Sequence, residues 1–133
     1  VLEMAVEEEG YEGVALDVIE CLSGARQGTS ILNVPNRGAI AGMGEKDVVE
    51  VTCCLGSSFI RPVAIGSVPD HALGLMKQVK EYERLTIKAA LSSSYQVALQ
   101  ALALHPLVPG YEIARHILDD YIQAHGDLFP KLG

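Results

Sequence analysis

Apolar residues recur at helical spacing in four stretches of the chain, and these stretches predict four helices. They cover residues 4–22, 70–91, 95–104 and 111–124. Ser23-Gly24 is a suitable C-terminal stop for the first helix, and the proline of His105-Pro106 ends the third. The residues expected to face inward are Ala15, Val18, Ile19 and Leu22 in the first helix, and Ile113, Ala114, Ile117, Leu118, Tyr121 and Ile122 in the last.

Between the first two helices the pattern changes to short runs rich in β-branched residues, which predict strands. The runs are Thr29 to Val34, Val48 to Leu55 and Phe59 to Ile65. A short glycine-containing connection at 56–58 joins the last two runs and predicts an antiparallel hairpin. Pro62 lacks a backbone donor, so the third strand is expected at an edge or a bulge of the sheet.

This order of elements predicts an α+β fold, in which a small, mainly antiparallel sheet packs against a layer of helices. The chain has 133 residues, which is the size of one compact domain. We therefore expect a single domain over residues 1–133.

The composition argues against several classes of partner. The formal net charge is -7, and the lysines and arginines are scattered, so neither a nucleic acid nor an anionic membrane is an expected ligand. No stretch has the roughly 18 consecutive apolar residues of a membrane span.

Three cysteines, two of them adjacent, form no disulfide framework and favour a reducing, cytoplasmic location. Since the first residues already read as helical and are not preceded by Met, we expect the sequence to start partway through a longer gene product.

Motifs for catalysis, cofactors and metals are missing from the sequence. The glycines at 38, 42 and 44 do not have the spacing of a dinucleotide-binding or Walker loop. None of the four histidines pairs with another histidine or a cysteine at a metal-ligand spacing. Cys53 and Cys54 are adjacent strand residues, which point to opposite faces, so we interpret them as structural thiols. We predict no catalytic, cofactor-binding or metal-binding residue in this chain.

The most unusual local feature is the segment Asn33-Val34-Pro35-Asn36-Arg37-Gly38. In one interpretation it is a strand end whose asparagine side chains satisfy backbone groups of the following loop. In the other it is a polar loop that faces a ligand, with Arg37 available to an anion. Asn33, Asn36 and Arg37 are the candidate substrate-binding residues.

Five motifs in a fixed order resemble the C-terminal half of family 4 glycoside hydrolases, in the version found in 6-phospho-β-glucosidases. The resemblance covers roughly Tyr11 to the C-terminus. The motifs are Val-Pro-Asn-Arg-Gly-Ala-Ile at 34–40, Asp-Val-Val-Glu-Val at 47–51, Arg-Pro-Val-Ala-Ile-Gly at 61–66, Tyr-Glu-Arg-Leu-Thr-Ile at 82–87 and Ala-Leu-Ala-Leu-His-Pro-Leu at 101–107.

This resemblance implies a fold similar to lactate and malate dehydrogenases, with an N-terminal Rossmann domain for NAD and a C-terminal part that completes the substrate cleft and helps form homo-oligomers. It implies cleavage of a phosphorylated β-glucoside by oxidation at C3, removal of the C2 proton by a tyrosine and elimination of the aglycone. The resemblance also implies a divalent metal such as manganese, which in the family is held by a Cys and a His. In the family these groups lie upstream of the matched region, so the chain itself is expected to bind neither cofactor and to show no turnover.

Two departures from the family pattern and two alternatives remain. Glu9-Gly10-Tyr11-Glu12-Gly13 stands where an Arg-Gly-Gly stretch is usual, and Met43-Gly44-Glu45 replaces a Leu-Pro pair.

One alternative is a non-catalytic oligomerisation module, suggested by the regular last helix and an exposed edge strand. The other is the C-terminal domain of a 2-hydroxy-acid dehydrogenase, which shares the architecture.

Overall fold

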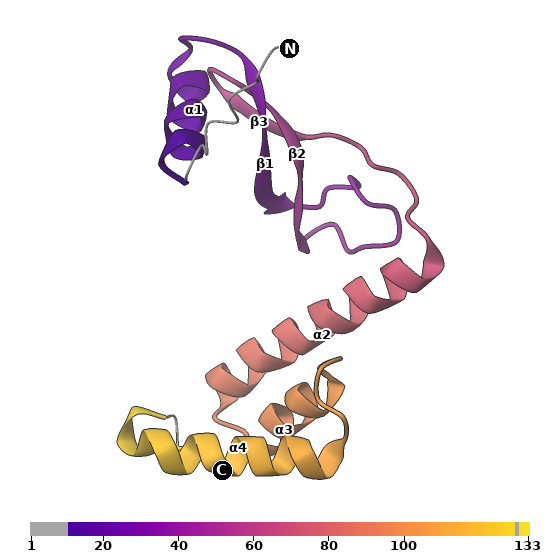
Figure 1. The fold of residues 1–133 in the computed structure, drawn as a ribbon, viewed down its shortest axis with the longest axis vertical. Helices are drawn as coiled ribbons and strands as arrows, with labels where there is room; N and C mark the ends of the chain where they lie inside the picture. Colours follow the sequence, from indigo (N-terminus) through magenta and orange to yellow (C-terminus); the bar gives the residue numbers. More distant parts are fainter. Residues whose placement is uncertain (1–10, 130) are drawn as a thin grey trace, which may run out of the picture. The chain divides into compact units, whose positions relative to one another are not determined.

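A computed structural model describes residues 11–129 and 131–133 of the chain. It divides into two compact units, the first ending at Val68 and the second beginning at Pro69. Within these described residues, the first unit holds one helix and three strands, and the second holds three helices and a short 3-10 turn (Figure 1). The expected α+β class with a small antiparallel sheet is confirmed. The single domain over residues 1–133 stays a prediction.

The first unit is a three-stranded antiparallel sheet with one helix beside it (Figure 1). Helix α1 spans Tyr11–Ser23, and the strands are β1 (Gly28–Pro35), β2 (Val48–Gly56) and β3 (Phe59–Pro62), in the spatial order β1-β2-β3. The predicted hairpin between β2 and β3 is confirmed. The predicted part of the first helix before residue 11, with its acidic run at 7–9, lies outside the described residues.

Strand β2 is the centre of this sheet and has the regular alternation of a half-buried strand. Val49, Val51 and Cys53 are buried, whereas the residues between them are exposed. Strand β3 lies at the edge, as its proline predicts. It ends at Pro62 rather than Ile65, because the Ile65 amide leaves the sheet and donates to the carbonyl of Ala39 at 2.7 Å.

The apolar stripe predicted for α1 is only partly buried. Cys21 is 1% exposed and Val18 is half-buried, but Ile19 is 61% exposed and Leu22 is exposed as well. Apolar residues occur on several sides of this helix, so the helical period alone could not define which side faces the sheet. The inward assignment of Ala15, Ile19 and Leu22 is wrong for the described residues.

The second unit stacks three helices, with α3 between α2 and α4 (Figure 1). They are α2 (Asp70–Ser92), α3 (Tyr95–Leu104) and α4 (Tyr111–His125), followed by the 3-10 turn η1 (Gly126–Leu128). Leu99 from α3 and Ala114 and Leu118 from α4 form the buried cluster of this unit. Ile113 and Tyr121, which the sequence pattern placed inward, are about half exposed because they lie at the edges of the apolar face of α4.

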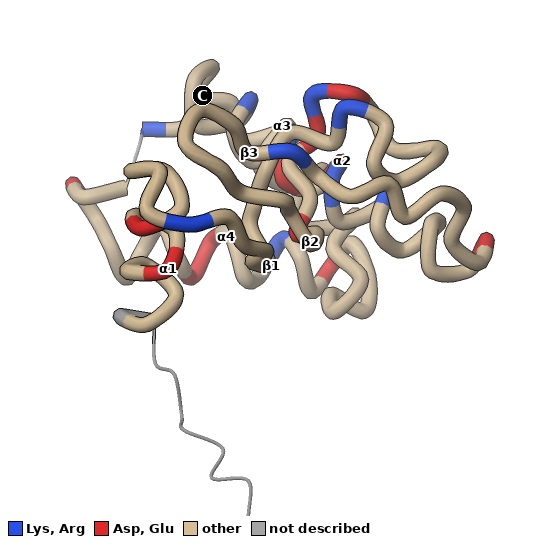
Figure 2. Tube along the Cα trace, turned by 90° about the horizontal axis from the view of Figure 1, so that it is seen from above, with Lys and Arg blue, Asp and Glu red and all other residues tan. Residues whose placement is uncertain are grey.

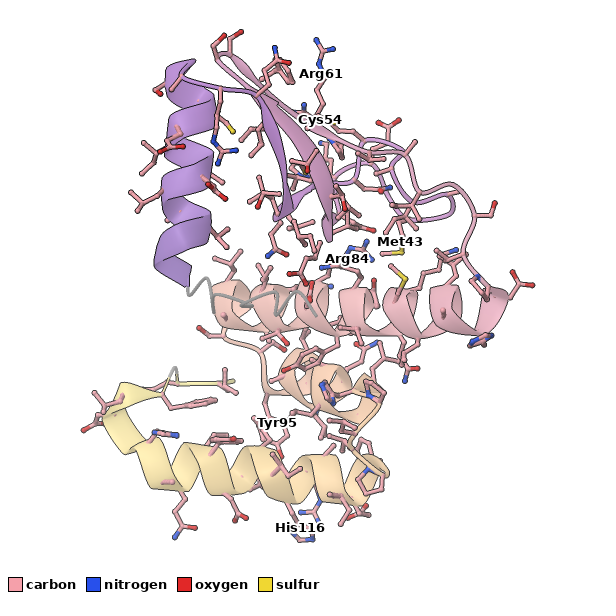
Figure 3. The ribbon with its side chains drawn as sticks, turned by 45° about the horizontal axis from the view of Figure 1, so that its top comes forward. Met43, Cys54, Arg61, Arg84, Tyr95 and His116 are labelled. Atoms are coloured by element: carbon pink, nitrogen blue, oxygen red, sulfur yellow. The ribbon has the colours of Figure 1, made fainter. Side chains whose placement is uncertain are left out.

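Helix α3 is tied to α4 by a polar contact as well as by this core. The hydroxyl of Tyr95, labelled in Figure 3, donates to Asp119 Oδ1 at 2.7 Å. This hydrogen bond is the main reason that the pKa of Tyr95 is raised. None of the helices in the described part of the chain is long and apolar enough to cross a bilayer.

The start of α3 gives a first testable prediction. Ser94 is its N-cap, and the Ser94 hydroxyl accepts a hydrogen bond from the backbone N–H of Val97 at 3.4 Å. Ser94→Ala removes this acceptor and is expected to lower the free energy of unfolding by about 1 kcal/mol, measured by urea denaturation. Ser94→Asp restores a capping oxygen and should recover most of the loss. Equal loss in both variants would show that the cap contributes nothing.

Candidate substrate-binding loop

The candidate segment begins the loop that joins β1 to β2, residues 36–47, which we call the Asn36 loop. Its two ends are held together by backbone hydrogen bonds. The Asn36 amide donates to the Asp47 carbonyl at 2.7 Å, and the Arg37 amide donates to the Glu45 carbonyl at 3.0 Å. The pairing of β1 with β2 therefore extends into the loop and closes it into a compact Ω-like turn.

Asn36 is the internal support of this loop. It is 0% exposed, and its side-chain Nδ2 donates to the carbonyls of Ile40 and Met43, each at 3.1 Å. Its Oδ1 accepts from the amide of Ile40 at 2.7 Å. Both amide hydrogens are used, so the Asn36 side chain has no donor left for a ligand. This geometry matches the interpretation in which the asparagine satisfies backbone groups of its own loop.

A second set of hydrogen bonds fixes the far side of the loop to the segment after β3. The Ala39 carbonyl accepts from the Ile65 amide at 2.7 Å, and the Gly66 carbonyl accepts from the Ala41 amide at 2.9 Å. Ala39, Ile40 and Met43 are buried. The Asn36 loop is thus fixed by the hydrogen bonds between its ends, by those to residues 65 and 66, and by the Asn36 side chain inside it.

Arg37 lies at the tip of a tight turn within this rigid loop. The Ala39 amide donates to the Asn36 carbonyl at 2.7 Å, and the two central residues have positive φ, 44° at Arg37 and 85° at Gly38. Positive φ at both positions is typical of a type I′ turn, which favours Gly and Asn. An arginine in this left-handed region is strained by about 1–2 kcal/mol. Strained residues of this kind cluster at functional sites.

An open cavity of about 350 Å³ lies beside the turn. It is lined by Pro35, Arg37, Glu45 and Lys46, all of which are exposed. Lys and Arg are interspersed with Asp and Glu along the trace (Figure 2), so this cavity is not part of a long basic stripe. Among the residues that the structure describes, no carboxylate forms an ion pair with Arg37 or Lys46.

The three predicted site residues therefore have different positions. Arg37 lines the cavity, and Asn36 holds the loop from within. Asn33 is exposed on β1, opposite Glu50 in the register of the sheet, and does not line the cavity. The sequence did not identify Glu45 and Lys46 as cavity residues, because only the closure of the loop brings them beside Arg37.

Of the two adjacent cysteines, Cys53 has the buried position expected of a structural thiol and Cys54 does not. Cys53 is 0% exposed and its pKa is raised by burial, whereas Cys54 is exposed on the opposite face of β2. Figure 3 shows Cys54 close to Arg61, its partner in the register of β3. Across residues 11–129 and 131–133, no three His, Cys, Asp or Glu side chains form a group that could hold a metal ion.

Thiol labelling tests this arrangement. Cys54 is expected to react with DTNB quickly, and Cys21 and Cys53 only on unfolding, because both are buried. One thiol equivalent should therefore be released rapidly from the native protein, and Cys54→Ser should abolish that rapid phase. Rapid release of all three would contradict the buried positions of the other two.

The chain matches a known protein family over most of its length. Residues 2–108 match the model described as "Family 4 glycosyl hydrolase C-terminal domain". This match includes the whole sheet, the Asn36 loop, and helices α1 to α3.

Curated relatives agree with that match. The chain is 34% identical to a probable 6-phospho-beta-glucosidase of Bacillus subtilis over 121 residues, which cover 91% of the chain and 27% of that protein. It is 40% identical to a maltose-6'-phosphate glucosidase of the same organism, over 77% of the chain and 23% of that protein. The chain therefore spans about a quarter of the length of these relatives.

Solved structures show the same fold. A 6-phospho-alpha-glucosidase from gut microorganisms, in complex with NAD and Mn2+, superposes with a TM-score of 0.86 at 34% identity over 93% of the chain and 29% of that structure. The 6-phospho-beta glucosidase from Thermotoga maritima, with manganese, NAD+ and glucose-6-phosphate, superposes with a TM-score of 0.83 at 34% identity, over 92% of the chain and 30% of that structure.

Proposed function

Because this chain belongs to the family 4 glycosyl hydrolases, as their C-terminal domain, we propose that it is the substrate-side part of an NAD- and manganese-dependent 6-phospho-β-glucosidase. The observation that carries the proposal is the family match over residues 2–108. It is supported by two superposed structures, which between them contain NAD, manganese and glucose-6-phosphate. We call the longer protein that would contain this chain the parent enzyme.

The family match does not decide between an α- and a β-glucoside, so this choice depends on the sequence motifs of the chain. Relatives acting on 6-phospho-β-glucosides and on maltose-6'-phosphate match this chain at similar identity. The five sequence motifs, however, resemble the β type. We therefore favour the β anomer.

In this proposal the chain contributes a substrate contact and no cofactor ligands. Arg37 is the contact, because it is exposed at the rim of the cavity. Asn36 positions it, and Asn33 is exposed on β1 but does not line the cavity. The described residues provide no group of three ligands for a metal ion, and in this proposal the manganese is held by the rest of the parent enzyme. The same proposal includes a cytoplasmic location and a phosphorylated β-glucoside as substrate.

The experiment uses the parent enzyme and two chromogenic substrates. With NAD and Mn2+ present, p-nitrophenyl β-glucoside 6-phosphate should release p-nitrophenol much faster than the α anomer does. The unphosphorylated β-glucoside is the control and should remain uncleaved. Faster cleavage of the α anomer would contradict the β assignment, and no cleavage of either phosphorylated substrate would contradict the proposal as a whole. This chain alone should show no turnover of any of the three.

A second candidate role is assembly of copies of the chain. In α1, Leu16 and Ile19 are 62% and 61% exposed, and β1 is an edge strand of the sheet. Exposed apolar side chains and a free strand edge are both features of surfaces that associate. If α1 forms such a contact, Ile19→Lys should lower the sedimentation coefficient of the chain at high concentration. A chain that is monomeric at every concentration would exclude this role for the isolated chain.

A further inference from the structure

We propose that residues 131–133 form a strap that opens and closes along one side of an apolar cavity in the second unit, while the helices stay folded. The strap lies beyond residues 2–108, the part of the chain that the family model matches. The cavity is a different one from the cavity beside the Asn36 loop, and the inference is independent of the proposed function.

The cavity has a volume of about 300 Å³, and side chains from all three helices of the second unit line it. Ala90 comes from α2, Ala101 from α3 and Leu118 from α4. The alanines leave space that larger side chains would fill. Phe129 and Leu132, which follow α4, complete the lining. The strap therefore supplies one wall of the cavity through Leu132.

The far end of the strap is docked on the corner where α2 ends and α3 begins. The Gly133 amide donates to the Ser93 carbonyl at 2.8 Å, and the Gly133 carbonyl accepts from the Tyr95 amide at 3.1 Å. This is the hydrogen-bond pattern of a parallel β-bridge between Gly133 and Ser94. Backbone groups at helix ends lack a partner within their own helix. The strap docks at this corner because it satisfies one such carbonyl and one such amide.

A stack of aromatic rings anchors the chain just before the strap. The rings of Tyr121 and His125 stack with centroids 5.7 Å apart, and those of His125 and Phe129 with centroids 6.5 Å apart. Both distances are within the range of favourable ring pairs. Phe129 also packs against the buried cluster of α3 and α4. We therefore expect Phe129 to stay in place when the strap opens.

The strap has few contacts compared with the helices beneath it. Lys131 and Gly133 are exposed, and Leu132 is half-buried. The buried cluster of the second unit comes from α3 and α4, so it does not depend on the strap. Segments with few buried apolar contacts open locally at a lower free energy than the whole domain. The strap is expected to open in this way.

Amide hydrogen exchange of the full chain, followed by NMR, tests the proposal. Opening breaks the hydrogen bonds of the Tyr95 and Gly133 amides together, so the two should have equal protection factors. Both should be at least tenfold lower than the protection factor of the Leu118 amide within α4. Protection equal to that of Leu118 would show that the strap opens only on unfolding of the unit, and would overturn the proposal. Unequal protection, or none, would exclude a docked strap that opens in one step.

Two leucines near the end of the chain provide a matched pair of variants. Leu132→Ala removes a half-buried side chain and should lower the protection of the Tyr95 and Gly133 amides about fivefold. Leu128 is 91% exposed, so Leu128→Ala should leave that protection unchanged. Neither substitution should change the protection of the Leu118 amide. Equal effects of the two substitutions on the Tyr95 amide would contradict the docking of Leu132.

A disulfide can hold the strap closed, because the Cα atoms of bridge partners lie close enough for one. The variant is Ser94→Cys with Gly133→Cys, in a Cys54→Ser background that lacks the exposed thiol. Fluorescence of the apolar dye ANS measures access to the cavity. The oxidised variant should bind ANS severalfold more weakly than the same protein reduced by dithiothreitol, since a fixed strap narrows the entrance. Equal binding by the two forms would overturn the role of the strap at the cavity.

A cavity-filling substitution shows where the dye binds. Ala90 lines the cavity and is exposed on α2, so Ala90→Phe fills space without changing the buried cluster. It should lower ANS binding to the reduced variant severalfold. Leu91→Phe alters the next residue, which is 84% exposed and does not line the cavity, and should have no effect. Equal ANS binding by the Ala90→Phe and Leu91→Phe proteins would place the dye elsewhere and overturn the cavity as the space that the strap controls.

Discussion

Replacing Asn36 with alanine is expected to lower the free energy of unfolding by about 3 kcal/mol, because buried backbone groups would lose their hydrogen-bond partners. The carbonyls of Ile40 and Met43 and the amide of Ile40 all bond to the Asn36 side chain. Each orphaned buried group costs roughly 1–3 kcal/mol, and the costs are not fully additive. Urea denaturation followed by circular dichroism measures the loss.

Two variants make this result specific. Asn36→Asp keeps the size and the acceptor oxygen but removes both donated hydrogens, so it should be nearly as destabilising as alanine. Asn33→Ala changes an exposed asparagine on the neighbouring strand and should change stability by less than about 0.5 kcal/mol. If Asn36→Ala were as mild as Asn33→Ala, the Asn36 loop would not depend on its buried amide.

Replacing Leu99 with alanine is expected to have a comparable effect on the second unit, again about 3 kcal/mol. Leu99 is 2% exposed and forms the buried cluster with Ala114 and Leu118, so truncation leaves a cavity between α3 and α4. Its neighbours there include Ala98 and Leu102, which are already held in their own helix and can refill little of the space. The loss should appear in the helical signal at 222 nm during thermal unfolding.

Leu91→Ala is the matched control for this prediction. Leu91 lies near the end of α2 and is 84% exposed, so the same substitution removes no buried contact. It should leave the midpoint of unfolding within a few degrees of the wild type. A Leu99→Ala midpoint equal to that of Leu91→Ala would contradict the buried cluster as the source of stability.

The elements of the fold were largely predictable because their signals are local. The β-branched run Val48 to Leu55 predicted strand β2, and the structure confirms it as Val48–Gly56. Helix α3 has the predicted bounds, Tyr95–Leu104, since serines precede it and a proline follows it closely. The exposure of Ile19 was not predictable in this way, because it depends on how α1 is turned against the sheet.

The candidate site was less predictable because it depends on how the Asn36 loop closes on itself, which no residue pattern indicates. The segment containing Asn36 and Arg37 was recognised as unusual, but the sequence did not distinguish a structural asparagine from a binding one. The buried amide of Asn36 and its three hydrogen bonds make that distinction. Glu45 and Lys46 had no signal of their own, since the backbone hydrogen bonds that close the loop bring them to the cavity.

Steady-state kinetics of the parent enzyme test the central claim most directly, which is that this chain contacts the substrate of a phospho-glucosidase through Arg37. With NAD and Mn2+ present, the wild type should hydrolyse p-nitrophenyl β-glucoside 6-phosphate. Arg37→Asn should raise KM about tenfold with little change in kcat, as expected when an interaction common to the ground state and the transition state is lost. Identical kinetic constants for the two proteins, or a change in kcat without a change in KM, would contradict it.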